Sequence, residues 1–271
     1  MTRPLIPPPW RPHVGRPRRR LLAALVAVLI GLTLSPAAVA AQQDLTEVSD
    51  RPIASFGGTA NSANARFIVG GYQHLLNRTA DEAGVDFHLA RMTSGGERTR
   101  LAFTYSLLFS AEGASQEVDR VYDQLLDRDP DAVGAQFWQA HLQGHDVLDL
   151  RVLVLSSDEY YSRAGGNDGA WLTALYRDVL GRDPDADGFA YWQARVATAP
   201  RPMIVAGLYL SDEALGRRVE AYYNEAVGRT PSEAEKTAGV ARIRSVGERH
   251  YRAIVWASDD AFEPYLDAAL S

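Results

Sequence analysis

The residues in this sequence with the clearest potential for chemistry lie in an acidic segment before an aromatic pair. Three aspartates at alternate positions are followed by a glycine: Asp183, Asp185, Asp187 and Gly188. Carboxylates at alternate positions can converge on one calcium ion, and glycine allows the sharp turn of such a loop. A calcium loop also needs a bidentate glutamate at its twelfth position, where this chain has Ala194.

Three sister segments favour a different role for these acids. They begin at Thr79, Asp129 and Thr230, and they replace Asp183 or Asp187 with residues that bind calcium poorly. Threonine caps a helix as aspartate does, so capping accounts for all four segments and calcium for one. We therefore predict that Asp183 is a helix cap and that the chain has no metal site. Calcium-dependent assembly stays open as an alternative.

An arginine recurs in each of these segments, always six residues after a tyrosine. The pairs are Tyr72/Arg78, Tyr122/Arg128, Tyr176/Arg182 and Tyr223/Arg229. Guanidinium groups bind carboxylates well, so each arginine could recognise an anionic ligand. Alternatively, each pairs with a neighbouring acid or with carbonyl groups at a helix end and fixes a corner between two helices. Recurrence beside a structural turn favours the second hypothesis.

The remaining side chains give no catalytic signature. Four tryptophans could stack on sugars, although their recurrent helical spacing predicts core positions: Trp138, Trp171, Trp192 and Trp256. His141 and His145 are four residues apart without an HExxH motif, so a zinc site is not expected. Motifs of serine hydrolases, phosphate-binding loops and dinucleotide folds are absent, and so is cysteine. We predict no catalytic residue and no cofactor.

These residues recur because the chain repeats a unit of about fifty residues. The intervals between the four arginines are 50, 54 and 47 residues. In each copy an apolar helix leads to the Tyr and Arg, a second helix follows the polar turn, and a third ends in Ser-x-acid. The serines, each expected to cap the next helix, are Ser110, Ser157, Ser211 and Ser258. The predicted fold is all-α, with four repeats of roughly three helices each.

A glycine-rich insert at Gly165–Gly169 suggests a division of the repeats into two pairs. It lengthens the connection between the second and third copies, and glycine favours a hinge there. The predicted pairs are residues 66–163 and 170–271.

The segment Leu175–Trp192 resembles a bacterial family catalogued as domain of unknown function 4214. The shared skeleton is LYxxLLGRxPDxxGxxYW, which includes Tyr176, Arg182, Gly188 and Trp192, and Ser157–Tyr160 matches its trailing Ser-x-Glu-Tyr. The resemblance runs from about Ala65 to the C-terminus and is strongest in the second and third copies. It implies an all-helical module common in secreted and surface-layer proteins, distantly similar to phycobilisome linker domains, with no established catalytic activity.

The first forty residues have the order of an export signal. Six arginines without an acid precede an apolar run over 21–34, and Ala38-Val39-Ala40 forms a cleavage site. A retained membrane anchor is the alternative, because 21–40 is long enough to span a bilayer. The twin-arginine route also stays open. Residues 41–65 are polar and predict a flexible spacer.

Charge and export together limit the functions to expect. Cleavage would remove six positive charges and no negative one, so the formal net charge would fall from −6 to −12. Nucleic acid and anionic membranes are poor partners for such a chain, with membrane contact only through an uncleaved leader. We expect a secreted or envelope-associated, non-catalytic binding or scaffolding protein for an unknown protein or glycan. The alternative is an envelope-glycan hydrolase or lyase with carboxylates between the repeat pairs, near Gly165–Trp171.

Overall fold

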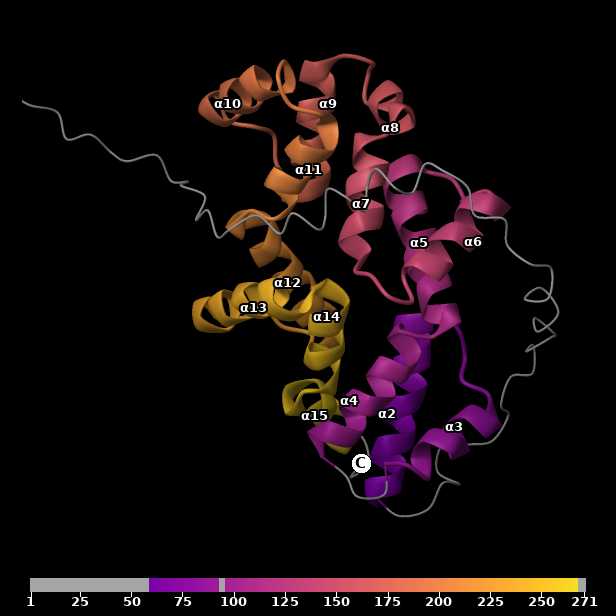
Figure 1. Cartoon of the computed structure of the whole chain (residues 1–271). Coiled ribbons are helices and arrows are strands. Elements are labelled where there is room, and N and C mark those ends of the chain that lie inside the picture. The colour runs from indigo at the N-terminus through magenta and orange to yellow at the C-terminus, as the bar shows by residue number, and fades with distance from the viewer. Residues whose placement is uncertain (1–58, 93–95, 268–271) are drawn as a thin grey trace, which may run out of the picture. The chain divides into compact units, whose positions relative to one another are not determined.

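The computed structural model describes residues 59–92 and 96–267, and every regular element within these ranges is a helix (Figure 1). The predicted all-α fold class is confirmed. In the same ranges, none of the helices combines the length and the apolar character that crossing a bilayer requires. The expected signal peptide and most of the expected spacer lie outside the described residues. Helix α2 begins at Thr59 and so includes the end of that spacer segment, where Ala63 and Ala65 are fully buried.

The helices follow one another with short connections. In chain order they are α2 (Thr59–Leu76), α3 (Glu82–Leu89), α4 (Glu97–Leu108), α5 (Ala111–Leu126), α6 (Ala132–His141), α7 (Val147–Ser156), α8 (Asp158–Arg163), α9 (Asp168–Leu175), the π-helix η3 (Tyr176–Leu180), α10 (Ala186–Val196), α11 (Arg201–Tyr209), α12 (Asp212–Ala226), α13 (Glu233–Val246), α14 (Glu248–Ala257) and α15 (Asp259–Asp267).

The helix after each arginine starts two residues later than the sequence predicts, and Asp183 is not a cap. The N-cap of α10 is Asp185, whose carboxylate accepts the backbone N–H of Gly188 at 2.8 Å. A capping residue gives its own carbonyl to the first bond of the helix. The carbonyl of Asp183 instead accepts a bond from Arg182 at 3.1 Å, and its side chain faces Arg177. The equivalent caps are Asp81, Asp131 and Ser232.

The serines at the ends of the third helices have the predicted capping role. Their hydroxyl oxygens accept backbone N–H groups one turn ahead, at 2.9 to 3.3 Å, from Gly113, Tyr160, Ala214 and Ala261. Each serine therefore starts a helix within two residues of the end of the preceding one, which keeps these connections tight.

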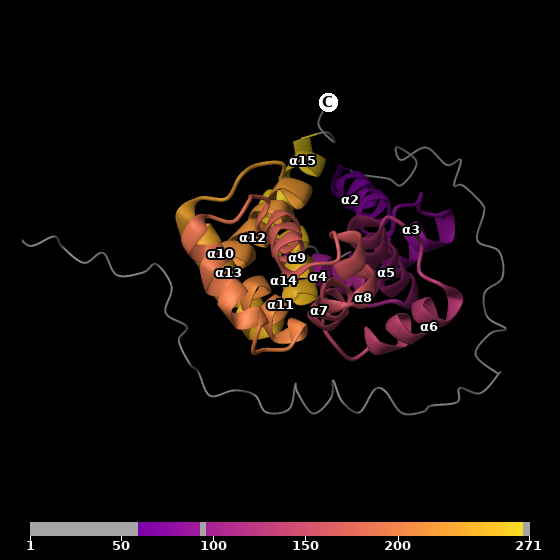
Figure 2. The same ribbon diagram turned by 90° about the horizontal axis from the view of Figure 1, so that it is seen from above.

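The end of the described chain packs against its beginning, a contact that the repeat pattern does not predict. Helix α14 packs extensively on α4, and α15 packs on α2 (Figures 1 and 2). Arg249 of α14 is 3% exposed and donates to the carbonyls of Leu142 at 2.5 Å and Leu108 at 2.6 Å. Its guanidinium thus satisfies the carbonyl ends of two other helices, which would otherwise be buried without donors.

The apolar core continues across the glycine-rich turn. One cluster of buried side chains runs from α5 to α12 and contains Trp138, Trp171 and Trp192. Trp171, just after the turn, is fully buried and donates its indole N–H to the carbonyl of Leu155 at 2.9 Å. Trp256 is buried in a second cluster with α2 and α4. All four tryptophans are therefore core residues, as their helical spacing predicts.

Candidate functional site

The recurrent arginines form corners in which each guanidinium is already paired. Arg128 donates through Nε and Nη2 to both carboxylate oxygens of Glu159, at 2.6 and 2.7 Å, and Arg182 does the same with Glu213 at 2.5 and 2.9 Å. Arg78 pairs in this way with Glu112. Each of these acids is the last residue of a Ser-x-acid motif. The arginines thus join one corner to the start of a later helix.

The fourth corner keeps the arginine but changes its partners. Arg229 pairs with Asp260 at 2.5 Å and also with Glu235, which replaces the glycine of the other corners. In all four corners the guanidinium lies over the ring of the preceding tyrosine, with 4.7 to 5.4 Å between the guanidinium carbon and the ring centre, at Tyr72, Tyr122, Tyr176 and Tyr223. These contacts support the structural hypothesis for the recurrent arginines rather than a ligand at each one.

The spacing between tyrosine and glycine, which recurs in the first three corners, also has a packing reason. The hydroxyl of Tyr176 lies 2.6 Å from the position that a Cβ on Gly188 would occupy. Trp192, one turn further along α10, is 9% exposed and closes the same corner from the core side. The signature residues therefore build the scaffold.

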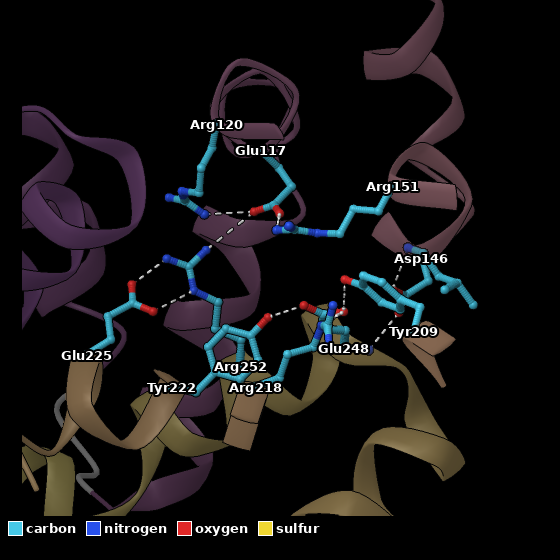
Figure 3. A network of polar contacts seen from close by, with 11 residues as sticks. Glu117, Arg120, Asp146, Arg151, Tyr209, Arg218, Tyr222, Glu225, Glu248 and Arg252 are labelled. Atoms are coloured by element: carbon cyan, nitrogen blue, oxygen red, sulfur yellow. Dashed lines mark hydrogen bonds and ion pairs between the residues drawn. The ribbon is translucent and has the colours of Figure 1, made fainter. Parts of the chain in front are cut away.

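A separate site lies where helices from distant parts of the chain meet. An open cleft of about 740 Å³ is lined by residues of α2, α5, α7, η3, α12 and α14. Its lining includes six arginines and four acids: Arg120, Arg151, Arg177, Arg217, Arg218 and Arg252, with Glu117, Asp178, Glu225 and Glu248. Many of these side chains form the polar network in Figure 3.

Glu117 is the centre of one half of this network. Its carboxylate contacts Arg120 at 2.8 Å, Arg151 at 3.1 Å and Arg252 at 3.6 Å, and the residue is 7% exposed. Burial alone would raise the pKa of Glu117, but the surrounding guanidinium groups outweigh burial, Arg151 first, and lower that pKa to about 2. Glu117 is therefore ionised throughout the physiological range.

Glu248 is the centre of the other half. It accepts the hydroxyl protons of Tyr209 at 2.9 Å and Tyr222 at 2.6 Å, and it lies 3.2 Å from Nε of Arg218. Burial raises the pKa of both tyrosines, so both hydroxyls remain donors. The carboxylate of Glu248 is held by three side chains from α11 and α12, which links α14 to those helices.

Asp146 connects this network to the start of two helices. It is the N-cap of α7, accepts the backbone N–H of Leu148 at 3.2 Å, and also accepts the N–H of Glu248 at the start of α14 at 2.8 Å. Burial, and then the charge of Glu248, raise the pKa of Asp146 to about 6. Gly247 makes this shared cap possible, because it has φ of 95° and a Cβ there would lie 2.1 Å from Asp146 Oδ2.

The π-helix supplies one wall of the cleft. Arg177, Asp178 and Val179 of η3 all line it. A π-turn widens a helix by one residue and is frequent at functional sites. The corresponding helices α5 and α12 continue regularly to the corner. The local geometry that distinguishes the third copy therefore faces the cleft.

The pKa shifts of two buried acids bear on the alternative of glycan hydrolysis. A glycoside hydrolase needs a carboxyl group whose raised pKa keeps a proton for the leaving group. Glu117 has the opposite shift, and Asp146, whose pKa is raised, does not line the cleft. Among the described residues that line the cleft, none belongs to 165–171, the segment expected near the active site of a glycan hydrolase or lyase.

The histidine pair lies elsewhere and is engaged within α6 and its surroundings. The rings of His141 and His145 stack with 4.1 Å between their centres, and His141 Nε2 lies 3.0 Å from Asp149 Oδ2. In the described ranges, no group of three or more histidine or acidic side chains could hold a metal ion.

The repeat pattern does not reveal the cleft, because the residues that line the cleft do not recur at equivalent positions. A signal was present in Arg151, which interrupts the apolar run Leu150–Leu155. A charged residue inside an apolar helix is costly unless it is paired, so it marks a buried polar network. The sequence pattern of this one helix does not identify the residues of α5 and α14 that belong to the same network as Arg151.

Comparison with known proteins finds a similarity to one family model in two regions of the chain. Searches of curated proteins and of solved structures found no match. The family model described as Domain of unknown function (DUF4214) matches residues 53–116 and 152–218. Each matched region contains a corner arginine and its acid partner, Arg78 with Glu112 and Arg182 with Glu213. Two regions of the chain are therefore similar to the DUF4214 family.

Proposed function

We propose that the chain is an exported, non-catalytic binding or scaffolding protein of the cell envelope or extracellular space. Its four helical repeats provide the frame, and the arginine-lined cleft is the binding site. The partner is a protein or glycan of the envelope. Export rests on the basic, apolar and small-residue order of the first forty residues.

One observation carries the binding role: the cleft is open, yet its central acids are held by fixed partners. Glu117 contacts three arginines, and Glu248 contacts two tyrosines and one arginine. Side chains fixed in this way present a preorganised surface, which lowers the ordering cost of binding. An ionised Glu117 gives no proton to a leaving group, so this geometry supports recognition over glycan hydrolysis.

The frame also suits a scaffold. The corner arginines bind acids 31 or 34 residues ahead, which ties each unit to the next. The contact of α14 with α4 then brings the last unit back to the first. A ligand in the cleft would touch helices from every part of this arrangement.

Export is tested by expressing the full chain in a bacterium and sequencing the N-terminus of the product outside the cytoplasm. We expect a new N-terminus after Ala40. A product that remains in the cytoplasm with residues 1–40 intact would contradict export.

Binding is tested by immobilising the recovered chain and measuring retention of soluble envelope polysaccharides, peptidoglycan fragments and secreted proteins. Ala221 is an exposed residue of α12 that lines the cleft, so Ala221→Trp should fill it and reduce retention. Ala238→Trp is the matched control, because Ala238 is an exposed alanine of α13 outside the lining. Equal retention by both variants would contradict the cleft as the binding site. Release of new reducing ends in the same incubations would contradict a non-catalytic role.

A further inference from the structure

We propose that the cleft recognises an oxyanionic group of its partner, a phosphate or carboxylate group with about two negative charges. This inference rests on the proposed binding function and adds the chemical class of the ligand. Six arginines and four acids line the cleft, which leaves a formal excess of two positive charges. The chain as a whole has a formal net charge of −6, so this excess is local.

Part of the excess charge lies around Glu117. One carboxylate there faces three guanidinium groups, those of Arg120, Arg151 and Arg252 (Figure 3). Arg252 is 5% exposed at its side chain and takes a second acid, Glu225, through a two-point contact. Arg120 and Arg151 have no second acid of this kind among the described residues. Like charges held this close in a poorly hydrated site favour an added anion.

Arg151 also carries an unused donor. Its Nε is buried, and within the described part of the chain it has no hydrogen-bond partner. Buried donors in native proteins are almost always paired with protein, water or ligand. If the Arg151 side chain shifts on binding, an oxygen atom in the cleft would satisfy this N–H and would also approach the excess charge.

Two further arginines of the lining are exposed. Arg217 is exposed, and in the described ranges no carboxylate forms an ion pair with it. Arg177 is 63% exposed at its side chain and makes one contact, with Asp183 at 2.6 Å. These side chains retain free donors, so they can bind an entering anion without first breaking a buried network.

The size of the cleft agrees with a compound rather than with a bare ion. Ligand sites for small molecules commonly occupy about 300 to 1,000 Å³, and this cleft has about 740 Å³. Guanidinium groups bind phosphate and carboxylate through two parallel hydrogen bonds. A neutral sugar has no charge that could balance the arginines. The cleft should therefore prefer an oxyanion to a neutral sugar.

Calorimetric titration of the full chain at pH 7 and low ionic strength tests this inference, with inorganic phosphate, citrate and glucose as separate probes. We expect one anion per chain, weaker binding when sodium chloride is added, and no heat with glucose. Phosphate without citrate binding would assign a phosphate group, and citrate without phosphate would assign carboxylates. Arg217→Gln and Arg177→Gln should each raise the dissociation constant about fivefold. Arg98→Gln, at an exposed arginine of α4 outside the lining, should leave it unchanged.

Failure to bind either anion would overturn the inference. So would equal affinity in the three arginine variants, because the anion would then sit elsewhere. Retention of a neutral polymer that Ala221→Trp abolishes, without anion binding, would overturn the inference and leave the proposed function standing. Equal retention by Ala221→Trp and Ala238→Trp would instead remove the proposed function.

Discussion

Arg182 forms a two-point ion pair with Glu213, which lies 31 residues further along the chain. The same guanidinium covers the ring of Tyr176 and donates to the carbonyl of Asp183. One side chain therefore joins the end of η3, the turn before α10 and the first turn of α12. Its geometry depends on the planar fork of arginine.

Replacing this fork with an ammonium group should weaken the corner. We expect Arg182→Lys to lower the free energy of unfolding by about 1 kcal/mol, because lysine cannot make the parallel contacts and the pair is partly exposed. Urea unfolding monitored by circular dichroism measures the change. The control is Arg98→Lys on the surface of α4, with no expected effect. Equal losses in both variants would show that the fork has no special role.

The tyrosine–glycine contact predicts opposite outcomes for two similar substitutions. Gly188→Ala would place a Cβ 2.6 Å from the hydroxyl of Tyr176, and we expect a loss of about 1 to 3 kcal/mol. Gly134→Ala leaves 3.4 Å to the hydroxyl of Tyr122 and should be neutral, or stabilising by up to about 1 kcal/mol through helix propensity. Thermal and urea unfolding of both variants compare the two sites.

Removal of the hydroxyl tests the cause of that difference. In the double variant Tyr176→Phe with Gly188→Ala, the added methyl group has more room, so much of the lost stability should return. If the double variant is as unstable as the sum of the single variants, the clash is not the reason.

The shared cap at Asp146 predicts a dependence of stability on pH. The pKa of this carboxyl is raised to about 6 in the folded chain, above its usual value of 3.8. Between pH 3.8 and 6 the folded state binds more protons than the unfolded state. The contribution of Asp146 to the free energy of unfolding is therefore present below pH 3.8 and is lost as the pH rises through 6. Asn is neutral and can also cap. Asp146→Asn should therefore gain stability relative to the native chain between pH 4 and 7, by about 2 kcal/mol.

An exposed cap provides the control with the opposite sign. Backbone N–H groups, first that of Gly134, lower the pKa of Asp131. The contribution of Asp131 to the free energy of unfolding is therefore present above the pKa of this carboxyl in the unfolded chain, and it is lost at lower pH. Urea midpoints for Asp146→Asn and Asp131→Asn at several pH values should shift in opposite directions relative to the native chain. Parallel shifts would contradict the role of burial at Asp146.

Local features of this fold were predictable because they recur in the sequence. The spacing from tyrosine to arginine and the Ser-x-acid motif both mark helix ends, and the structure places the arginine of one on the acid of the other. The sequence predicts an acid partner for each recurrent arginine. It does not identify Glu159 or Glu213 as that partner, because no local pattern connects residues 31 positions apart. The sequence predicts a cap at Asp183, whereas α10 begins after Asp185. The carbonyl of Asp183 accepts a bond from Arg182, a contact that the local sequence does not reveal.

The cleft was not predictable because it depends on packing between distant helices. The repeat pattern is alike in each unit, whereas the contact of α14 with α4 depends on single residues. Arg249 of α14 donates to the carbonyl of Leu108, and Arg100 of α4 donates to the carbonyl of Ala257 at 2.9 Å. Such contacts depend on the angles between successive helices. Those angles come from side-chain packing along the whole chain, and no short motif encodes them.

Glu117 is the residue whose loss should most change both stability and binding. Glu117→Gln leaves Arg120, Arg151 and Arg252 facing one another, and we expect a loss of about 3 to 5 kcal/mol at pH 7. The lowered pKa means that the contribution of Glu117 is present above its unfolded pKa of about 4.5 and is lost as the pH falls toward 2. The difference between variant and native chain should therefore shrink over that range.

The same substitution should make the protein more responsive to anions. Without the carboxylate, the excess positive charge of the cleft increases by one, so added phosphate should raise the unfolding midpoint of Glu117→Gln more than that of the native chain. Glu220→Gln is the control, because Glu220 of α12 forms a partly exposed pair with Lys236 at 2.6 Å, and its loss should cost under about 1 kcal/mol without a phosphate effect. Equal phosphate responses in the two variants would mean that the guanidinium groups around Glu117 do not meet the anion.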